Sequence, residues 1–495
     1  MNKSGGEQQD GMLSRRGIAF CGDGHFTGRS MPIRFFNTFS RRIEDFVPLE
    51  PGVVRLYTCG PTVYNFAHIG NFRAYIFEDL LQRHLEYRGF RVIRVMNLTD
   101  VDDKTIRGCR AAGMPLAEFT KPFKQAFFED LDALRIKRAE HFPEATAADH
   151  IARMISMIST LVEKGHAYRA DDGSVYFRIR SFPAYGQLAH IVLDELKAGV
   201  RVRSDEYEKE NVGDFALWKA WDQADGDVWW ESPWGRGRPG WHIECSAMAT
   251  GILGPQIDIH CGGEDNIFPH HEAEIAQSEC VTGLQFSKYW LHCKHLQVEG
   301  TKMAKSAGNF FTLRDLTLEK GWTGREVRYA LLSVKYREQL NFTIEGLAAA
   351  RSALARLDEW NRRIRELAES AKSACGTDLA GIDGFGTSLD DDLNISAALA
   401  SVFDVIRETN RRIDLGEVTP GEAKALVEWL EGVQSVLAME PEVEEVPGEV
   451  TALAEIRSQA RANKDWKASD SLRDQIQALG WTVKDTKDGQ KLTRN

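Results

Sequence analysis

The sequence has no long hydrophobic run, and no stretch of its 495 residues approaches the roughly 20 apolar residues that a membrane-spanning helix needs. It also lacks the charged, apolar and small-residue order of a secretory signal peptide at its start. Cysteine is scarce, with 8 residues and no CxxC pair, which excludes a disulfide scaffold of the secreted type. We therefore expect a cytoplasmic protein that keeps its thiols reduced and has no membrane partner.

An excess of positive charge is also missing, because the formal net charge is -11. A protein that binds nucleic acids indiscriminately normally presents a basic surface, so this class is disfavoured. Charge is nevertheless uneven: acidic residues crowd the stretch 440–449, and residues 451–495 are locally basic. This order is typical of an acidic linker that precedes a small basic module.

The alternation of strand-like and helix-like segments predicts an α/β fold. Val53 to Thr58 and Val92 to Met96 have strand character, and Ala74 to Arg88 between them has that of a crossover helix, as in a parallel sheet. The same rhythm resumes at Gln256 to His260 after a region rich in tryptophan and turn residues, so an insertion splits one sheet domain. After about residue 346 the pattern becomes amphipathic and helical, which predicts a helix bundle.

Two short segments have the composition of phosphate-binding loops. His68-Ile69-Gly70-Asn71 precedes the predicted helix, so backbone N–H groups and the positive end of the helix dipole suit an anion there. Lys302-Met303-Ala304-Lys305-Ser306 supplies two lysines and a hydroxyl on a segment that can close over a triphosphate. Each segment alone is weak evidence, but together they predict an ATP site.

Four residues that could bind zinc stand at predicted element boundaries. Cys59 follows the first strand, Cys245 lies just after Trp241, and Pro269 is expected to start a helix that places His270 and Glu274 one turn apart on one face. Two thiols, an imidazole and a carboxylate form a set that zinc accepts. The alternative is that the cysteines are small buried apolar residues and the histidine caps a helix. Rival ligands that the sequence does not exclude are Cys261, His271, His292, Cys293 and His295.

Together these features resemble the class I aminoacyl-tRNA synthetases, and among them the cysteinyl-tRNA synthetase family. The resemblance covers nearly everything after Met31. Besides the ATP signatures, the candidate ligands and the basic tail, four further segments carry it: Tyr57 to Tyr64, Asn97 to Lys104, Gly240 to Met248 and Phe268 to Glu272.

The resemblance implies a Rossmann-type parallel-sheet catalytic domain split by a connective insertion, then an α-helical bundle and a small C-terminal anticodon-binding domain. The predicted parts are a disordered extension or misplaced start at 1–30, the first half of the catalytic domain at 31–145, the connective insertion at 146–238, the second half with the lysine loop at 239–306, a stem-contact region at 307–345, the bundle at 346–445 and the anticodon-binding domain at 446–495.

The resemblance also implies ATP-dependent activation of L-cysteine to cysteinyl-adenylate and transfer to the 3′ end of tRNA(Cys). The expected partners are ATP, L-cysteine and tRNA(Cys), the expected cofactors are one Zn²⁺ per chain and Mg²⁺ with ATP, and the expected state is a monomer. Zinc would select the substrate, because a thiophilic metal prefers the thiolate of cysteine to the hydroxyl of serine.

The family motifs imply a role for each matching residue. The catalytic residues are His68, Asn71, Lys302 and Lys305. ATP binding adds Gly70, Gly263, Asp265 and Ser306. The residues implied to bind cysteine are Trp241, Cys59 and Thr99. The residues implied to bind zinc are Cys59, Cys245, His270 and Glu274.

Three positions depart from the family pattern. Ala304 stands where the lysine loop commonly has serine, so one hydroxyl is lost there. Asn71 stands where many relatives have histidine, and it keeps a hydrogen-bond donor. Leu492 stands where several relatives have an aromatic residue, which weakens the expectation of an anticodon contact at that position.

Two alternative functions stay open at this point. One is a cysteine ligase of the same ancestry that joins cysteine to an amino sugar and needs no anticodon module. The other is a noncatalytic tRNA-binding or zinc-binding relative, which would not need both ATP signatures. Arginines in the predicted bundle could contact tRNA or form an ordinary solvated face; they are Arg351, Arg356, Arg362 and Arg363.

Overall fold

The computed structural model describes residues 32–191, 214–303, 308–375, 382–441, 447–486 and 489–494. The extension predicted over residues 1–30 lies outside these ranges. The chain divides into two compact units, Met1–Met439 and Glu440–Asn495, and each is described by itself.

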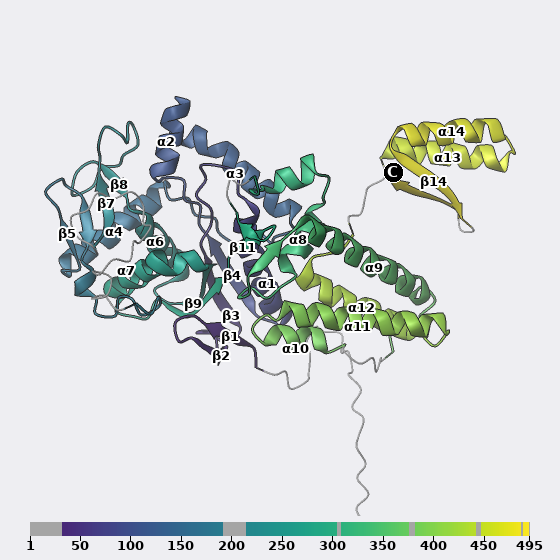
Figure 1. The fold of residues 1–495 in the computed structure, drawn as a ribbon, viewed down its shortest axis with the longest axis horizontal. Coiled ribbons are helices and arrows are strands. Elements are labelled where there is room, and N and C mark those ends of the chain that lie inside the picture. Colours follow the sequence, from purple (N-terminus) through teal and green to yellow (C-terminus); the bar gives the residue numbers. More distant parts are fainter. Residues whose placement is uncertain are drawn as a thin grey trace, which may run out of the picture. The chain divides into compact units, whose positions relative to one another are not determined.

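A parallel sheet stands at the centre of the first unit (Figure 1). Its four strands follow the order β10 (Ser287–Cys293), β9 (Ile257–Gly263), β3 (Val53–Thr58) and β4 (Arg91–Met96), and every neighbouring pair is parallel. The strands predicted from the sequence are therefore confirmed. Because the strands are parallel, all their carboxyl ends meet at one edge of the sheet.

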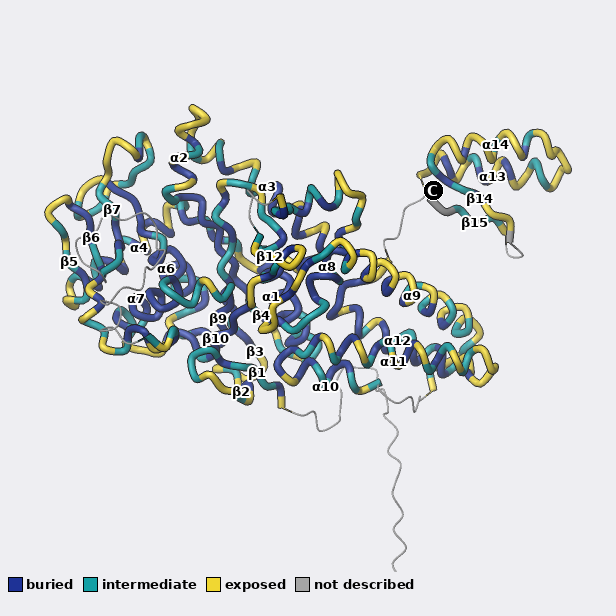
Figure 2. Tube along the Cα trace, viewed as in Figure 1, coloured by how far each residue is buried: buried dark blue, intermediate teal, exposed yellow. Residues whose placement is uncertain are grey.

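The sheet is covered on both faces, as parallel sheets usually are. On the central strand β3, the successive residues Leu56 and Tyr57 point to opposite faces, and both are 0% exposed. Figure 2 shows similar burial along the neighbouring strands. Burial on both faces explains why apolar residues stand at successive positions, as Val95 and Met96 do in β4.

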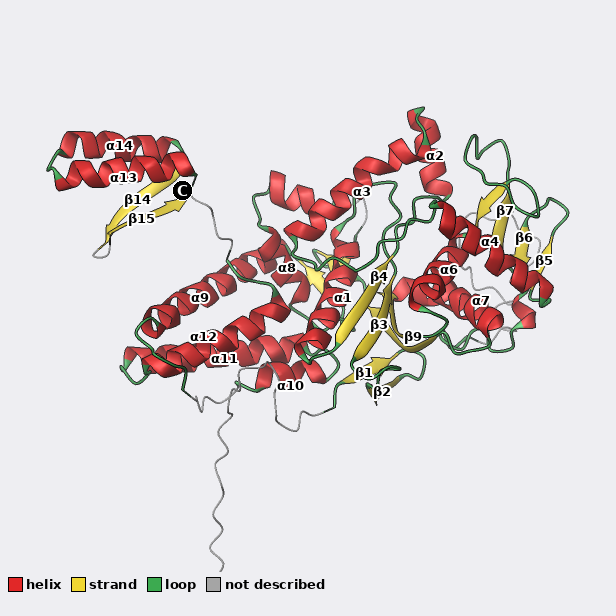
Figure 3. Cartoon of the chain, turned by 180° about the vertical axis from the view of Figure 1, so that it is seen from behind, coloured by secondary structure: helices red, strands yellow, loops and turns green. Residues whose placement is uncertain are grey.

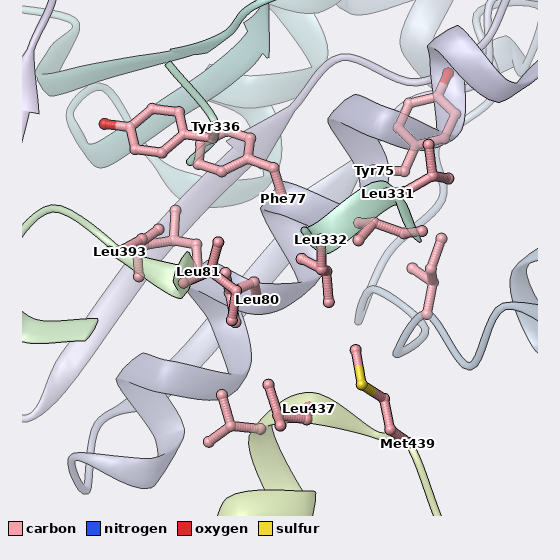
Figure 4. Packing of buried hydrophobic residues seen from close by; sticks show 14 of the residues in the cluster. Tyr75, Phe77, Leu80, Leu81, Leu331, Leu332, Tyr336, Leu393, Leu437 and Met439 are labelled. Carbon is pink, nitrogen blue, oxygen red and sulfur yellow. The ribbon is translucent and has the colours of Figure 1, made fainter. Parts of the chain in front are cut away.

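Helix α1 (Ile69–Tyr87) crosses from β3 to β4 and is the centre of the largest apolar cluster. The ring of Phe77 stacks on that of Tyr336, with centroids 4.3 Å apart. Leu80 and Leu81 of the same helix point toward the end of the bundle, where Leu437 lies (Figure 4). The central sheet and the helical bundle therefore share one core.

Shorter elements surround this sheet. Helices α2 (Asp103–Ala112) and α3 (Leu116–Ala133) follow β4. The strands β1 (Arg34–Asn37) and β2 (Arg42–Asp45) form a hairpin, and β11 (Leu296–Val298) pairs with β12 (Thr301–Lys302) and β13 (Leu340–Phe342).

The insertion forms a small antiparallel sheet of its own. Its elements are α4 (Ala148–Glu163), β5 (Ala167–Arg169), β6 (Val175–Phe177), β7 (Phe215–Ala220) and β8 (Gly237–Pro239). The chain then returns to the central sheet through α6 (Trp241–Leu253) and, after β9, α7 (Glu272–Thr282). In Figures 1 and 3, α4, α6 and α7 lie between the two sheets.

The rest of the first unit is helical. Its helices are α8 (Gly324–Leu332), α9 (Ile344–Ala368), α10 (Gly384–Asp390), α11 (Ile395–Asp414) and α12 (Pro420–Leu437). The four arginines singled out in the sequence lie on α9, and three of them are paired with carboxylates of the chain itself: Arg351 with Glu326, Arg362 with Glu359 and Glu366, and Arg363 with Asp414. The guanidinium of Arg356 lies over the ring of Phe403. These contacts favour the prediction that the arginines form an ordinary solvated face over the prediction that they contact tRNA.

The second unit comprises α13 (Gly448–Ala462), α14 (Trp466–Ala478) and the antiparallel strands β14 (Trp481–Thr486) and β15 (Gly489–Arg494). Its small core contains Ile476, Trp481 and Val483, and Leu492 packs against it opposite Val483. A leucine at 492 therefore serves the core of this unit. None of the helices in the described parts of the chain combines the length and hydropathy needed to cross a membrane.

Arg328 of α8 ties several parts of the first unit together. Its fully buried guanidinium donates to Asp79 Oδ2 of α1 at 2.5 Å, to Leu437 O at the end of α12 at 2.6 Å and to Leu134 O at 3.1 Å. Burial would raise the pKa of Asp79, but Arg328 and Arg83 outweigh burial and hold that pKa below its ordinary value. The carboxylate is therefore ionised inside the core.

We expect Arg328→Met to lower the free energy of unfolding by about 3–5 kcal/mol, because the Asp79 carboxylate would stay buried without its partner. Thermal unfolding followed by circular dichroism measures the change. Arg362→Met is the matched control: Arg362 pairs only with exposed carboxylates on α9, so its loss should leave the unfolding midpoint nearly unchanged. Equal losses in the two variants would contradict the role given to Arg328.

Candidate active site

The first phosphate-binding signature forms the start of α1. His68 is the N-cap residue, and its ring Nδ1 accepts a hydrogen bond from Asn71 N at 3.3 Å. In return, His68 N donates to Asn71 Oδ1 at 3.1 Å, so the two residues form a reciprocal capping box. The side chain of Asn71 thus acts as a hydrogen-bond acceptor at this cap, whereas the residue type had suggested a role as a hydrogen-bond donor. No acidic residue in the first turn offsets the positive end of the helix dipole.

The second signature lies beside the first. A Cβ built on Gly70 would be 2.9 Å from His68 Nδ1 and 3.2 Å from Met303 Cε, so glycine lets the two segments approach. Ile69 N donates to Phe311 O at 3.0 Å, and His68 forms an isolated antiparallel bridge with Thr312. Lys302 is exposed at the end of β12. Lys305 and Ser306, with Ala304, lie outside the described residues.

The four predicted zinc ligands come together at the carboxyl edge of the central sheet. Cys59 follows β3, Cys245 lies in α6, and His270 and Glu274 are presented by the start of α7. One donor atom from each residue lies within 4.8 Å of every other. Cys245, His270 and Glu274 are each at most 1% exposed.

Pro269 starts the helical turn that leads into α7, as predicted. It lies in a π-helical segment, Ile267–His271, in which Phe268 alone is non-helical, with φ −137° and ψ 132°. This conformation is expected because a residue that precedes proline avoids the helical region. The segment continues directly into α7 at Glu272, and His270 Nε2 lies 3.1 Å from Glu274 Oε1, one turn along.

A second donor set overlaps the first. It consists of Cys59, His260, His271 and Glu274, again with donor atoms within 4.8 Å of one another. Glu274 stands between the two sets, because its Oε1 faces His270 while its Oε2 lies 2.9 Å from His260 Nε2. Cys59 Sγ lies 3.3 Å from His271 Nε2. Of the rival ligands, His271 joins this second set, whereas Cys261, His292, Cys293 and His295 join neither set among the described residues.

His260 was not predicted as a candidate ligand from the sequence. It stands on β9 within a strand that is buried on both faces, where an apolar residue is the rule. Its ring stacks on Trp290 with centroids 4.6 Å apart, and it is 0% exposed. A histidine in a strand that is buried on both faces was the available signal.

The electrostatics of the first donor set suit a divalent cation. Burial would raise the pKa of Cys245, but the hydrogen bond with Cys59 and the nearby His270 lower it to about 6. Burial would also raise the pKa of Glu274, but His260 and His270 lower it to about 2. Burial would lower the pKa of His270, yet Cys245 and Glu274 raise it to about 10. A proton on the imidazole thus balances two anionic donors, and a metal cation fits in place of that proton.

Aromatic and imidazole rings enclose this donor set. Trp241, the first residue of α6, stacks on His270 with centroids 4.2 Å apart and an interplanar angle of 28°. The Nδ1 atoms of His270 and His242 lie 2.9 Å apart, so the Nε2 of His270 is the nitrogen that faces the other donors. The ring of Trp241 therefore has the position of a wall beside the cluster.

The remaining predicted residues also follow strands of the central sheet. Gly263 ends β9, and Asp265 stands two residues after it with a side chain that is 66% exposed. Thr99, after β4, is 2% exposed, and its hydroxyl donates to Glu244 Oε2 at 3.1 Å. The hydroxyl of Thr99 is thus engaged within the protein.

Three family descriptions match this chain. Residues 45–352 match the catalytic domain of the class I tRNA synthetases, group C, residues 384–439 match the DALR domain, and residues 443–492 match the cysteinyl-tRNA ligase anticodon-binding domain.

Curated relatives match over nearly the whole chain. A cysteine–tRNA ligase of Protochlamydia amoebophila is 49% identical over 475 residues, which cover 94% of this chain and 98% of the relative. A cysteine–tRNA ligase of Chlamydia abortus is 51% identical over 466 residues, with 93% and 97% covered.

Solved structures share the fold at much lower identity. A Mycobacterium tuberculosis methionyl-tRNA synthetase in complex with methionyl-adenylate superposes with a TM-score of 0.61 at 15% identity, over 78% of this chain and 92% of that one. A leucyl enzyme from Agrobacterium radiobacter, solved with tRNA, gives 0.59 at 13% identity, over 80% and 85%. At these identities the likeness concerns the fold alone.

Gly60, next to Cys59, is the tightest backbone approach at this edge. A Cβ on Gly60 would lie 1.7 Å from Asn97 O. We therefore expect Gly60→Ala to lower the free energy of unfolding by about 1–3 kcal/mol, because the ends of β3 and β4 would have to separate. Differential scanning calorimetry measures the effect.

Gly432→Ala is the control for that substitution. Gly432 lies within α12, and its nearest neighbour, Tyr87 Cε2, is at an ordinary 3.5 Å. Alanine should raise the stability of this helix by about 0.5–1 kcal/mol. A Gly60→Ala protein as stable as the original would refute the close approach.

Proposed function

Because this chain belongs to the family of class I cysteinyl-tRNA synthetases, we propose that it activates L-cysteine with ATP and transfers it to the 3′ end of tRNA(Cys). The observation that carries the proposal is the 49% identity to a cysteine–tRNA ligase over 94% of the chain, catalytic and anticodon-binding parts included. In this proposal the catalytic domain occupies 31–306 around the insertion at 146–238. The stem-contact region at 307–345, the bundle at 346–445 and the anticodon-binding domain at 446–495 follow.

The anticodon-binding match separates this function from its nearest alternative. A ligase that joins cysteine to an amino sugar has no use for an anticodon-binding domain, and residues 443–492 match one. A noncatalytic relative would not need to retain His68, Lys302 and Lys305 together. The full enzymatic function is therefore favoured.

The chain's own residues serve the first step by position and charge. The carboxylate of cysteine attacks the α-phosphorus of ATP, and pyrophosphate leaves. His68, Gly70 and Asn71 place the positive end of α1 toward the phosphates, where an anion is stabilised. Lys302 and Lys305 neutralise the charge that develops as pyrophosphate departs. Mg²⁺ accompanies ATP, as is usual for a metal bound mainly by phosphate oxygens.

Adenosine and cysteine are assigned to two parts of the same edge. Gly263 and Asp265, after β9, receive adenosine, because open α/β sheets bind ligands outside the carboxyl ends of their strands. Trp241, Cys59 and Thr99 form the cysteine side. In the second step a ribose hydroxyl at the 3′ end of tRNA attacks the activated carbonyl, and AMP leaves.

One zinc ion per chain would be held by Cys59, Cys245, His270 and Glu274. When bound, zinc supplies a thiophilic centre that favours the thiolate of cysteine over the hydroxyl of serine. This set contains two sulfur donors and the overlapping set contains one, so the softer set suits zinc better. All donors come from a single chain, which supports a monomer as the working unit.

The proposal is tested by two measurements on the purified protein. ATP–pyrophosphate exchange should depend on cysteine and should not be driven by serine. Transfer of cysteine to tRNA(Cys), with a free amino sugar as the competing acceptor, then separates the synthetase from the sugar ligase. Exchange without transfer to tRNA would overturn the proposed function.

Cys245→Ser should lose zinc and cysteine-dependent exchange while it stays folded, because the sheet core does not include the metal. Zinc is measured by elemental analysis, and folding by circular dichroism. Cys293→Ser is the matched control: Cys293 is buried at 2% exposure but belongs to neither donor set, so that variant should keep its zinc. Zinc retained by Cys245→Ser would remove Cys245 from the ligands.

Lys302→Met should lower the kcat of pyrophosphate exchange by roughly 100-fold, because a charge that acts on the developing pyrophosphate is lost. The KM for cysteine should change by less than threefold, since this lysine serves the phosphate side. Lys320→Met, at an exposed position beyond the loop, is the control and should retain the original kcat. A Lys302→Met enzyme with unchanged kcat would exclude this lysine from the step.

A further inference from the structure

The loop that follows β4 contacts both of the segments that carry the cysteines of the candidate metal site. It begins at Asn97 and passes through Thr99, and both side chains are buried at 1% and 2% exposure. On one side lies the segment of Cys59, and on the other the first turns of α6, which carry Cys245. These two segments are far apart in the sequence.

A continuous line of hydrogen bonds crosses this gap, and every donor points in the same direction. Gly60 N donates to Asn97 Oδ1 at 2.9 Å. Asn97 Nδ2 donates to Thr99 Oγ1 at 3.2 Å, and the hydroxyl of Thr99 donates to Glu244 Oε2 at 3.1 Å. The two ends of the line are the residues adjacent in sequence to Cys59 and Cys245.

The two halves of this line are held differently. The segment of Cys59 is fixed to the loop by backbone bonds as well, since Val63 N donates to Thr99 O at 3.0 Å and Thr99 N donates to Pro61 O at 3.1 Å. The loop joins α6 at this point through a side-chain bond, from Thr99 to Glu244. That bond therefore sets where α6 stands relative to the end of β3.

Glu244 has little else to hold it. It is 0% exposed, and within the described parts of the chain its Oε1 has no hydrogen-bond partner. Loss of the Thr99 hydroxyl would leave the whole carboxyl group without a partner, which is costly in a buried position. The side chain, and with it the adjacent Cys245, would then be expected to shift.

We propose that Asn97 and Thr99 are positioning residues that fix the separation of the two candidate sulfur donors, Cys59 and Cys245, through Glu244. This inference rests on the proposed function, because it takes those cysteines as zinc ligands. It adds residues that touch no metal themselves. Partners of this kind commonly change metal affinity by about 10–100-fold when they are lost.

The test measures the affinity for zinc in the full-length, zinc-loaded protein by competition with a chromophoric chelator. Thr99→Val keeps the shape but removes the hydroxyl, and we expect its zinc dissociation constant to rise by about 10–100-fold. Thr99→Ser restores the hydroxyl and should stay within threefold of the original. Asn97→Ala should also raise the zinc dissociation constant. This variant provides the test if Thr99→Val does not fold.

Thr105→Val is the matched control. Thr105 is also buried, at 0% exposure, and among the described residues its hydroxyl bonds with the backbone of Asp102 at the start of α2. This variant should lower the unfolding temperature but leave zinc affinity unchanged, so a general loss of stability is distinguished from a loss of positioning.

Each outcome decides the question. Weakened zinc in Thr99→Val with rescue by serine supports the positioning role. Unchanged zinc affinity in Thr99→Val together with a raised KM for cysteine would overturn the positioning role and leave Thr99 only the direct contact with cysteine that the proposed function assigns to it. If the unaltered protein binds no zinc but exchanges pyrophosphate with cysteine, the metal assignment itself fails, and the positioning role fails with it.

Discussion

The buried carboxylate of Glu274 is the interaction on which the candidate site depends. A carboxylate without exposure to water is stable only if its charge is compensated, and here two imidazoles share that task. His270 approaches one oxygen and His260 the other. Because both oxygens are engaged, Glu274 cannot rotate, and its two neighbours present donor atoms on opposite sides. This arrangement explains why two overlapping donor sets exist around a single residue.

The parallel sheet turns this local chemistry into a common site. Cys59 and Thr99 follow two adjacent strands and Gly263 ends the next one, so the order of the strands brings these residues to one edge. The start of α1 belongs to the same edge, because the chain leaves β3 through Cys59 and enters the helix at His68. The candidate metal ligand Cys59 and the positive end of α1 therefore belong to one short connection.

Much of this could be predicted from the sequence, for identifiable reasons. Buried parallel strands give continuous apolar runs, so β3 and β4 were evident, and the spacing of His270 and Glu274 follows from helical periodicity. The partnership of Cys59 with Cys245 depends on a chain return after the insertion, which spacing does not encode. His260 was missed because its role comes from a neighbour in space. The role of the Asn71 side chain as a hydrogen-bond acceptor depends on the geometry of the helix cap. Residue type alone allows an asparagine to donate or to accept.

Adenylate formation requires the two halves of this edge to act on one small molecule. In the proposed function, the carboxylate of cysteine reaches the α-phosphorus while its thiolate is held at the donor set. An anionic donor set would hold a thiolate only through a bound cation, whereas the positive end of α1 would attract the phosphates of ATP directly. The segment from Cys59 to His68 connects these two places, and Gly60 N donates to Asn97 Oδ1 within it. A fixed connection of this kind would orient the substrate for attack.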